Sequence, residues 1–473
     1  MKKRQMFIIA LILPSLFFCL AGCQAKFSSL KPALDEEGEV FVFLQPFPQE
    51  AERLRFGLTA VSAVRQDGTE VPLSLLFNKF EAPDMTRQRL VASGILPPGM
   101  YRGLSFGVAQ AVLTTDEGEA SLLLPEKPVV AELPFTIKRK KASSLFLNFI
   151  YQRSITGGFS FSPVFSLYTP GYPVTGLLGY VSNSGANTIT VFDKKAGQVV
   201  SVRATGRDPR GVVFDQERNR AYVALAGEDA VEAIDMKNED SLATIRLHTG
   251  AAPRDLALMP GGRLLMSVNP GTSTVSFIDP LSYLELSSTA VGYDPSAILV
   301  DPVSRNRAYV FNTSSNSVSI IDIPARKTAV TIPVETGPVR GQFNKNGDKL
   351  YVIYEATPHL TVVDPAALRV SDRVFIGAPA EAIKTDTMTD TVYFTGTGRS
   401  TVEMFEPYTL FATDFIPAEG GVSYLTIDGQ ENSLLLLSPE LRTITSVNLN
   451  TRNVVSVFDV GEDPYQVTLM GER

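Results

Sequence analysis

The sequence contains very few residues of the kinds that build metal and cofactor sites. Its 473 residues include two His, two Cys and no Trp. A copper cluster needs several His ligands, and two His cannot supply them. No C-x-x-C-H segment is present, so covalent attachment of a c-type haem is not expected. We therefore expect the protein to bind no cofactor and no metal ion.

Strong positive charge and long apolar runs are also missing. The formal net charge is -7 and no sustained basic face occurs, which argues against a nucleic acid partner. After residue 22, no stretch reaches the roughly 18 uninterrupted apolar residues that a membrane-spanning helix needs. By contrast, 35 Gly and 31 Pro supply the many turns that an all-β fold requires. A chain of this length also predicts at least two domains.

The N-terminus has the pattern of an export signal. Residues 1–5 (MKKRQ) are basic, and the apolar stretch that follows ends in Leu20-Ala21-Gly22-Cys23. These four residues resemble the bacterial lipobox. The resemblance implies that residues 1–22 are a signal peptide and that Cys23 is acylated as the first residue of the mature chain. Because Cys19 is lost with the signal peptide, no disulfide is then expected.

An acylated Cys23 would anchor the protein to a membrane without crossing it. Gln24 follows the cysteine. In Gram-negative lipoproteins an Asp at this position usually marks retention in the inner membrane, so the resemblance favours the outer membrane. The polar residues 23–35 are expected to form a tether.

The phrase YVFNTSSNSVSIIDI, residues 309–323, recurs along the second half of the chain, with copies starting at Tyr180, Tyr222, Tyr351 and Tyr393. Each copy ends in an acid or amide, and spacings of 42, 44, 43, 42, 42 and 42 residues separate Asp193, Asp235, Asp279, Asp322, Asp364, Glu406 and Asn448. A second series follows about sixteen residues later: Pro209, Pro253, Pro295, Pro338, Pro379, Gly421 and Pro464.

A period near 42 with alternating apolar residues is typical of propeller blades of four strands each. The first repeat starts at a second strand and the chain ends with a lone first strand, residues 464–470. We therefore predict a seven-bladed β-propeller over residues 177–473, closed by its C-terminal strand. The repeats resemble the YVTN family of bacterial propellers. The acids are expected to accept N–H bonds in the following turn rather than to bind metal, because they are spread one per blade.

Residues 36–168 show strand-like alternation with hairpin turns and are predicted to form a β-sandwich. They resemble an uncharacterised domain family of bacterial surface lipoproteins. Residues 169–176 are then expected to be a linker. The basic run Lys138–Lys141 is interpreted either as a solvated hairpin tip or as a contact to anionic lipid.

The candidate site residues lie in loops of the predicted propeller. His248 and His359 are expected on one face, three blades apart, and His248 with Arg254 and Glu355 forms a candidate catalytic set by resemblance to lactonase and lyase propellers. Arg210 and Arg254 follow the marker prolines, so they are expected either to form a basic collar or to pair with Asp208 and Asp255. Further binding candidates in the loops of that upper face are Asn312, Ser314 and His359, together with Arg210 and Arg254.

These features favour a monomeric, exported lipoprotein whose propeller is a binding platform for a protein, peptide or polysaccharide at the cell envelope. Two alternatives remain open at this stage. One is a hydrolase or lyase with its site at the mouth of the channel. The other is a cofactor-free structural component of an envelope or electron-transfer assembly.

Overall fold

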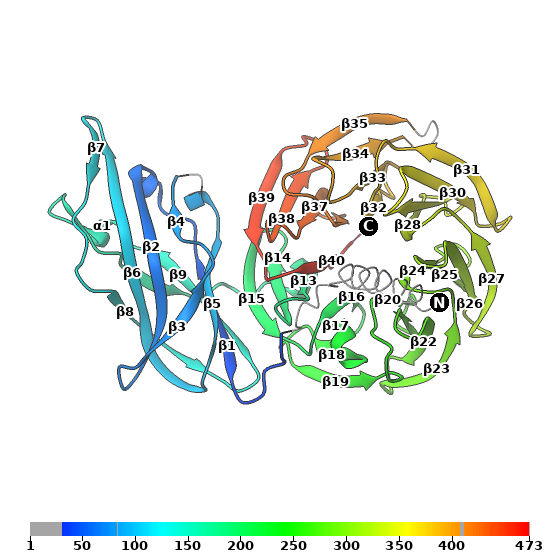
Figure 1. The fold of residues 1–473 in the computed structure, drawn as a ribbon, viewed down its shortest axis with the longest axis horizontal. Coiled ribbons are helices and arrows are strands. Elements are labelled where there is room, and N and C mark those ends of the chain that lie inside the picture. Colours follow the sequence, from blue (N-terminus) through cyan, green and yellow to red (C-terminus); the bar gives the residue numbers. More distant parts are fainter. Residues whose placement is uncertain (1–30, 83, 407–410, 473) are drawn as a thin grey trace, which may run out of the picture.

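The computed structural model describes residues 31–472 except 83 and 407–410. The chain forms a β-sandwich followed by a ring of seven four-stranded sheets. Figure 1 views the ring face-on, with the sandwich lying beside its rim next to β15 and β39. Both parts of the predicted fold class are therefore confirmed. Within the described residues, no helix is long and apolar enough to cross a membrane.

The sandwich is one strongly bent sheet whose two halves face each other. Its main strand order is β12-β9-β1-β5-β3-β2-β6-β7, with β4 paired to β2 and β8 paired to β6. The strand β3 joins the halves, because it pairs with β5 on one side and with β2 on the other. The bounds are β1 Gly38–Leu44, β2 Leu54–Arg65, β3 Glu70–Leu75, β4 Lys79–Phe80, β5 Arg89–Leu96, β6 Gly99–Thr115, β7 Gly118–Ser121, β8 Val129–Ile137, β9 Ala142–Phe149 and β12 Phe165–Tyr168.

Short elements complete this part of the chain. The bounds are η2 Gln49–Arg53, η3 Asp84–Thr86, α1 Tyr151–Ser154, β10 Ile155–Thr156, β11 Ser160–Phe161 and η4 Thr175–Leu177, the last of these directly before the propeller.

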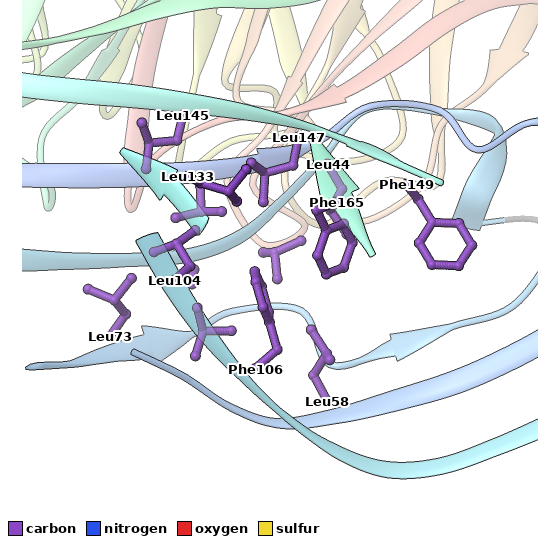
Figure 2. Packing of buried hydrophobic residues seen from close by; sticks show 14 of the residues in the cluster. Leu44, Leu58, Leu73, Leu104, Phe106, Leu133, Leu145, Leu147, Phe149 and Phe165 are labelled. Atoms are coloured by element: carbon purple, nitrogen blue, oxygen red, sulfur yellow. The ribbon is translucent and has the colours of Figure 1, made fainter. Parts of the chain in front are cut away.

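Large apolar side chains fill the space between the two halves of the sandwich. Phe106, Phe149 and Phe165 meet there with leucines from β1, β2, β3, β6, β8 and β9 (Figure 2). Phe106 and Phe165 have ring centroids 4.6 Å apart. These rings bury far more apolar surface than a hairpin alone could, which gives the sandwich a core of its own.

Each blade of the propeller has four antiparallel strands that follow one another from the channel outward. In that order, blade 1 has β40 Pro464–Leu469, β13 Leu178–Asn183, β14 Thr188–Asp193 and β15 Gln198–Ala204; blade 2 has β16 Pro209–Asp215, β17 Arg220–Leu225, β18 Ala230–Asp235 and β19 Ser241–Arg246; blade 3 has β20 Asp255–Leu258, β21 Leu265–Asn269, β22 Thr274–Asp279 and β23 Leu284–Ala290. Between β17 and β18 lies η5 Ala226–Glu228.

The other four blades follow the same plan. Blade 4 has β24 Pro295–Val300, β25 Arg307–Asn312, β26 Ser317–Asp322 and β27 Lys327–Pro333; blade 5 has β28 Pro338–Phe343, β29 Leu350–Tyr354, β30 His359–Asp364 and β31 Arg369–Phe375; blade 6 has β32 Ala382–Thr385, β33 Val392–Thr395, β34 Thr401–Phe405 and β35 Ala412–Pro417; blade 7 has β36 Tyr424–Asp428, β37 Ser433–Ser438, β38 Thr443–Asn448 and β39 Val454–Asp459.

The ring closes as the phase of the repeat predicts. The C-terminal strand β40 pairs antiparallel with β13, so blade 1 combines both ends of the propeller sequence. A buried ion pair reinforces this closure: Lys194 Nζ lies 2.9 Å from Asp428 Oδ1 of blade 7 and donates to the Met470 carbonyl at 2.6 Å. Closure completes the four strands of blade 1, so that each blade of the ring ends in a short outer edge.

The acids and amides that end the third strands act as turn caps. Asp193 Oδ1 accepts N–H bonds from Lys195 and Ala196, and Asp364 Oδ1 does the same for Ala366 and Ala367. Equivalent bonds are made by Asp235, Asp279, Asp322 and Asn448. For these six positions the prediction of a turn-capping role is confirmed.

The sandwich packs on the rim of the propeller through an apolar cluster that both parts share. Phe43 and Phe146 of the sandwich are buried against Val199 of β15 and Phe458 of β39. Polar bonds fix the register, because the buried side chain of Gln88 both donates to and accepts from the backbone of Val199. This docking onto blades 1 and 7 has no local signal in the sequence.

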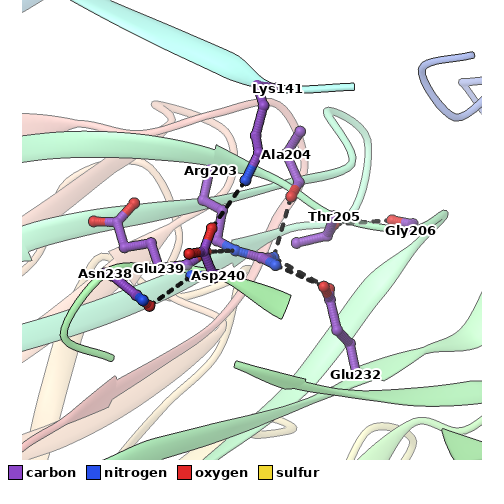
Figure 3. Close-up of polar contacts among 9 residues, drawn as sticks. All are labelled: Lys141, Arg203, Ala204, Thr205, Gly206, Glu232, Asn238, Glu239 and Asp240. Carbon is purple, nitrogen blue, oxygen red and sulfur yellow. Dashed lines mark hydrogen bonds and ion pairs between the residues drawn. The ribbon is translucent and has the colours of Figure 1, made fainter. Parts of the chain in front are cut away.

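Charged residues frame the same contact. Arg89 Nε lies 3.0 Å from Asp459 Oδ2, which also accepts the Leu90 N–H. β8 pairs with β6 and β9 with β1, so residues 138–141 form a loop between the two halves of the sandwich and not a hairpin tip. In this loop, Lys141 Nζ reaches Asp240 of the propeller at 3.2 Å (Figure 3). Next to it, Arg203 of blade 1 forms an ion pair with Glu232 of blade 2 at 2.6 Å. The basic run at Lys138–Lys141 therefore contributes to contacts within the protein.

Candidate functional site

The starts of the inner strands surround one cavity at the mouth of the central channel. Its volume is about 580 Å³. We call it the mouth cavity, and the face of the ring on which it opens the mouth face. Its lining comes from all seven blades: Ser184, Arg210, Arg254, Ser296, Val339, Arg340, Glu355, Glu381, Thr397, Ser423, Pro439, Asp463, Pro464 and Tyr465.

Arg210 and Arg254 are both partners of carboxylates. Arg210 Nε lies 3.0 Å from Asp208 Oδ1, and its guanidinium lies 5.1 Å from the centroid of the Tyr465 ring. Arg254 Nη1 lies 3.0 Å from Asp294 Oδ1. The expected pair of Arg210 with Asp208 is therefore present, whereas the expected partner of Arg254 is wrong.

Asp255 is unavailable to Arg254 because its carboxylate points into the wall between two blades. Oδ1 accepts the Leu256 N–H at 2.9 Å, and Oδ2 accepts the Ile298 N–H of blade 4 at 3.0 Å. Burial raises the pKa of this carboxyl, and the charge of Arg340 and the two N–H donors act in the opposite direction. Asp255 thus joins two inner strands.

Arg340 is the functional candidate that the sequence analysis missed. It lies on β28, two residues after the marker Pro338, and its guanidinium lies 4.6 Å from the centroid of the Tyr424 ring across the channel. Among the described residues, no carboxylate lies within 4 Å of it. A signal existed: Arg210, Arg254 and Arg340 all follow a marker proline by one or two residues.

Acidic residues occupy another part of the lining. Glu355 belongs to the loop after β29, Glu381 immediately precedes β32, and Asp463 immediately precedes β40. Thr397 Oγ1 donates to Glu381 at 2.5 Å. Over the described chain, no Lys, Arg or His nitrogen lies within 4 Å of the Glu355 or Asp463 carboxylates. The lining therefore carries charges of both signs, with arginines from blades 2, 3 and 5 and carboxylates from blades 5, 6 and 1.

The two histidines do not contribute to this cavity. His248 is largely exposed, and its Nδ1 lies 2.9 Å from Glu285 Oε2 on the outer strand β23. His359 Nδ1 lies 2.9 Å from Glu335 Oε2, and the same carboxylate pairs with Arg373 at 2.7 Å. The proposed set of His248, Arg254 and Glu355 is thus wrong as a single site, because only the last two line the cavity. Loop order alone did not reveal how far from the axis each His lies.

Asn312 also differs from its prediction as a binding residue. It is fully buried, and its Nδ2 donates to the hydroxyls of Ser317 at 3.2 Å and Ser319 at 2.9 Å. A Cβ built on Gly292 would lie 2.7 Å from the Asn312 Cγ, so the backbone at Gly292 covers the Asn312 side chain. Its role is to hold a hairpin together. Ser314 in the same loop is exposed, as a binding residue must be.

No group of three or more His, Cys, Asp or Glu side chains placed to hold a metal ion occurs in the described part of the chain. Cys23 and Gln24 lie outside the described residues. Lipidation therefore stays a prediction.

The sequence matches no protein-family model and no curated protein. Solved structures do resemble the fold. A functionally unknown protein from Desulfotomaculum acetoxidans aligns with a TM-score of 0.56 at 15% identity, covering 62% of this chain and 98% of that one. The dihydro-heme d1 dehydrogenase NirN, in complex with DHE, aligns with a TM-score of 0.51 at 12% identity, covering 64% and 77%.

The Kuenenia stuttgartiensis hydrazine synthase aligns with a TM-score of 0.49 at 15% identity, covering 54% of this chain and 87% of that one. At 15% identity or less, the two likenesses with TM-scores above 0.5 show that the chain has a propeller fold, and they show nothing further.

Proposed function

We propose that this protein is an exported, lipid-anchored binding protein whose propeller engages an envelope protein, peptide or polysaccharide through its mouth face. The observation that carries the proposal is the position of the sandwich. It packs on the rim at blades 1 and 7 (Figure 1), and the lining of the mouth cavity comes from propeller residues alone. A rigid ring with one free, polar face is the usual arrangement of a binding platform.

The loops of the mouth face support the same proposal. Loops of equal length connect the second and third strands of blades 4 and 5, yet residues 313–316 are TSSN and residues 355–358 are EATP. The blades share a scaffold and differ in what they present, so the face is one irregular surface and not seven equal sites. Membrane anchoring at Cys23, in the outer membrane as Gln24 favours, would hold this surface at the envelope.

Affinity purification of the lipidated protein from intact, cross-linked cells tests the proposal. In one variant, residues 355–358 are exchanged for the sequence of 313–316. In the matched control, the turn of the same blade on the opposite face, 365–368, is exchanged for the sequence of 323–326 from blade 4. We expect a saturable partner that is lost in the first variant and kept in the control. Equal binding by both variants, or no saturable partner, would refute a mouth-face platform.

A further inference from the structure

One arginine of the mouth cavity, Arg340, has no carboxylate within 4 Å among the described residues. Arg210 and Arg254 are neutralised by Asp208 and Asp294 at 3.0 Å. Arg340 interacts with the Tyr424 and Tyr465 side chains and with the more distant charge of Asp255, whose two oxygens already accept backbone N–H bonds. A guanidinium has five N–H donors, so Arg340 keeps donors for a ligand.

The aromatic contact orients this guanidinium. A guanidinium that lies over a ring face is held flat, and its N–H groups then point outward in the plane of the fork. Two N–H groups in this plane can donate parallel hydrogen bonds to the two oxygens of a carboxylate. The partly enclosed channel strengthens such a bond relative to bulk water.

The acidic residues of the cavity restrict the charge of the rest of the ligand. Glu355 and Asp463 are exposed, and no basic group lies within 4 Å of them in the described chain. These two carboxylates would repel a second negative charge on the ligand and attract a positively charged group. A volume of about 580 Å³ lies within the usual range for small-ligand pockets.

We infer that the mouth cavity binds a small zwitterion of the amino-acid or short-peptide type, with its carboxylate on Arg340 and its ammonium group among Glu355, Glu381 and Asp463. This inference deepens the proposed function, because it names a ligand chemistry for the same face. Failure of the zwitterion inference can be told apart from failure of the proposed function. The first is tested with small molecules and purified protein, and the second by capture of a partner from cells.

The test is calorimetric titration of the purified full-length protein with the dipeptide alanyl-alanine. Two derivatives serve as probes of the ligand: the C-terminal amide, which lacks the carboxylate, and the N-acetyl form, which lacks the ammonium. We expect the amide to bind about 10- to 100-fold more weakly, as for the loss of hydrogen bonds to a charged group. We expect a smaller loss of affinity for the N-acetyl form, because Glu355 and Asp463 are more exposed than Arg340.

Variants locate the site. Arg340→Ala should abolish binding, and Arg340→Lys should weaken it because a lysine lacks the planar fork. The matched control is Arg369→Ala on the outer strand of the same blade, where the arginine is exposed and far from the lining. Glu355→Gln should weaken alanyl-alanine but not its N-acetyl form. Circular dichroism of each variant separates loss of binding from loss of folding.

Three results would overturn the inference. They are the absence of measurable heat with the unmodified dipeptide at millimolar concentration, equal affinity for the dipeptide and its amide, and unchanged affinity in a folded Arg340→Ala variant. Because the first two use the wild-type protein, the inference stays testable even if every Arg340 variant fails to fold.

Discussion

Replacement of Lys194 by Met tests whether a buried ion pair holds the ring closed. The side chains of Lys194 and Asp428 are each 1% exposed. The lysine joins three segments: the end of β14, the end of β36 in blade 7, and Met470 after the C-terminal strand. Hydrogen bonds to charged groups contribute about 1.5–3 kcal/mol each, and Lys194 makes two, which suggests about 3–6 kcal/mol. Breaking one partner of a buried pair costs about 3–5 kcal/mol, because the other charge stays buried.

We therefore expect Lys194→Met to lower the free energy of unfolding by about 3–5 kcal/mol. Urea unfolding followed by circular dichroism measures it. The neighbouring Lys195 is exposed, so Lys195→Met is a matched control that should change stability by less than about 0.5 kcal/mol. The double variant Lys194→Met with Asp428→Asn should recover part of the loss, since no buried charge remains. If Lys194→Met and Lys195→Met unfold with the same free energy, the reasoning is wrong.

Three other substitutions probe the channel, a blade and the rim contact. Burial raises the pKa of the Asp255 carboxyl above 3.8, so the folded protein binds the carboxyl proton more tightly than the unfolded chain does. This contribution to the free energy of unfolding is lost as pH rises from 3.8 toward the folded-state pKa. Asp255→Asn should remove this pH dependence, as measured by urea unfolding across the same pH range. Asn312→Ala should cost about 1–3 kcal/mol in the same assay and leave partner capture unchanged, and lost capture in a folded variant would contradict its structural role. Phe43→Ala should cost about 3–5 kcal/mol and expose residues 169–176 to proteolysis, whereas wild-type cleavage rates would argue against rim packing.

The blades could be located from the sequence because their signals are local. Strand alternation, turn residues and two marker series repeat within each segment of about 42 residues, and β25 covers Arg307–Asn312 as its apolar pattern predicts. Closure followed from the phase of the repeat alone, because a lone inner strand at the C-terminus can only complete the blade that lacks one.

Asn312 shows what a local sequence pattern does not reveal about the role of a residue. Asn312 stands in a polar run that is typical of a loop, but hydroxyls five and seven residues later accept the two N–H bonds of its side-chain amide. The same spacing holds for Asn183 with Thr188 and Thr190, and for Asn269 with Thr274 and Ser276. That repeated spacing was a readable signal of a structural role.

The docking of the sandwich and the environment of Arg340 had no such signal. Arg89 and Asp459 are separated by 370 residues, and Arg340 meets Tyr424 from a different blade. Such contacts depend on how complete domains and blades pack, which side-chain alternation along one segment does not encode. The radial position of His248 depends on the ring in the same way.

The proposed lipid anchor has a geometric consequence for the mouth face. Lys31 Nζ donates to the Ala186 carbonyl at 3.1 Å, and Asn187 Nδ2 donates to the Lys31 carbonyl at 2.7 Å. Ser184 of the same loop lines the mouth cavity. Position 31 follows Cys23 by 8 residues, and an extended chain spans at most about 3.3–3.6 Å per residue, so this loop lies within about 30 Å of an acylated Cys23.

Energy transfer to acceptor lipids in proteoliposomes can measure this placement. If Cys23 is acylated and Cys19 is removed, a single introduced thiol can be labelled. We compare Glu462→Cys, on the mouth face two residues before β40, with Lys195→Cys, on the opposite face two residues after β14. Both positions are exposed and belong to blade 1, so they differ mainly in the face they occupy. Stronger transfer from position 462 is expected, because a short tether holds the mouth face toward the bilayer. Equal transfer, or stronger transfer from position 195, would show that the tether does not orient the ring, and a partner would then have to reach the mouth cavity from the side away from the membrane.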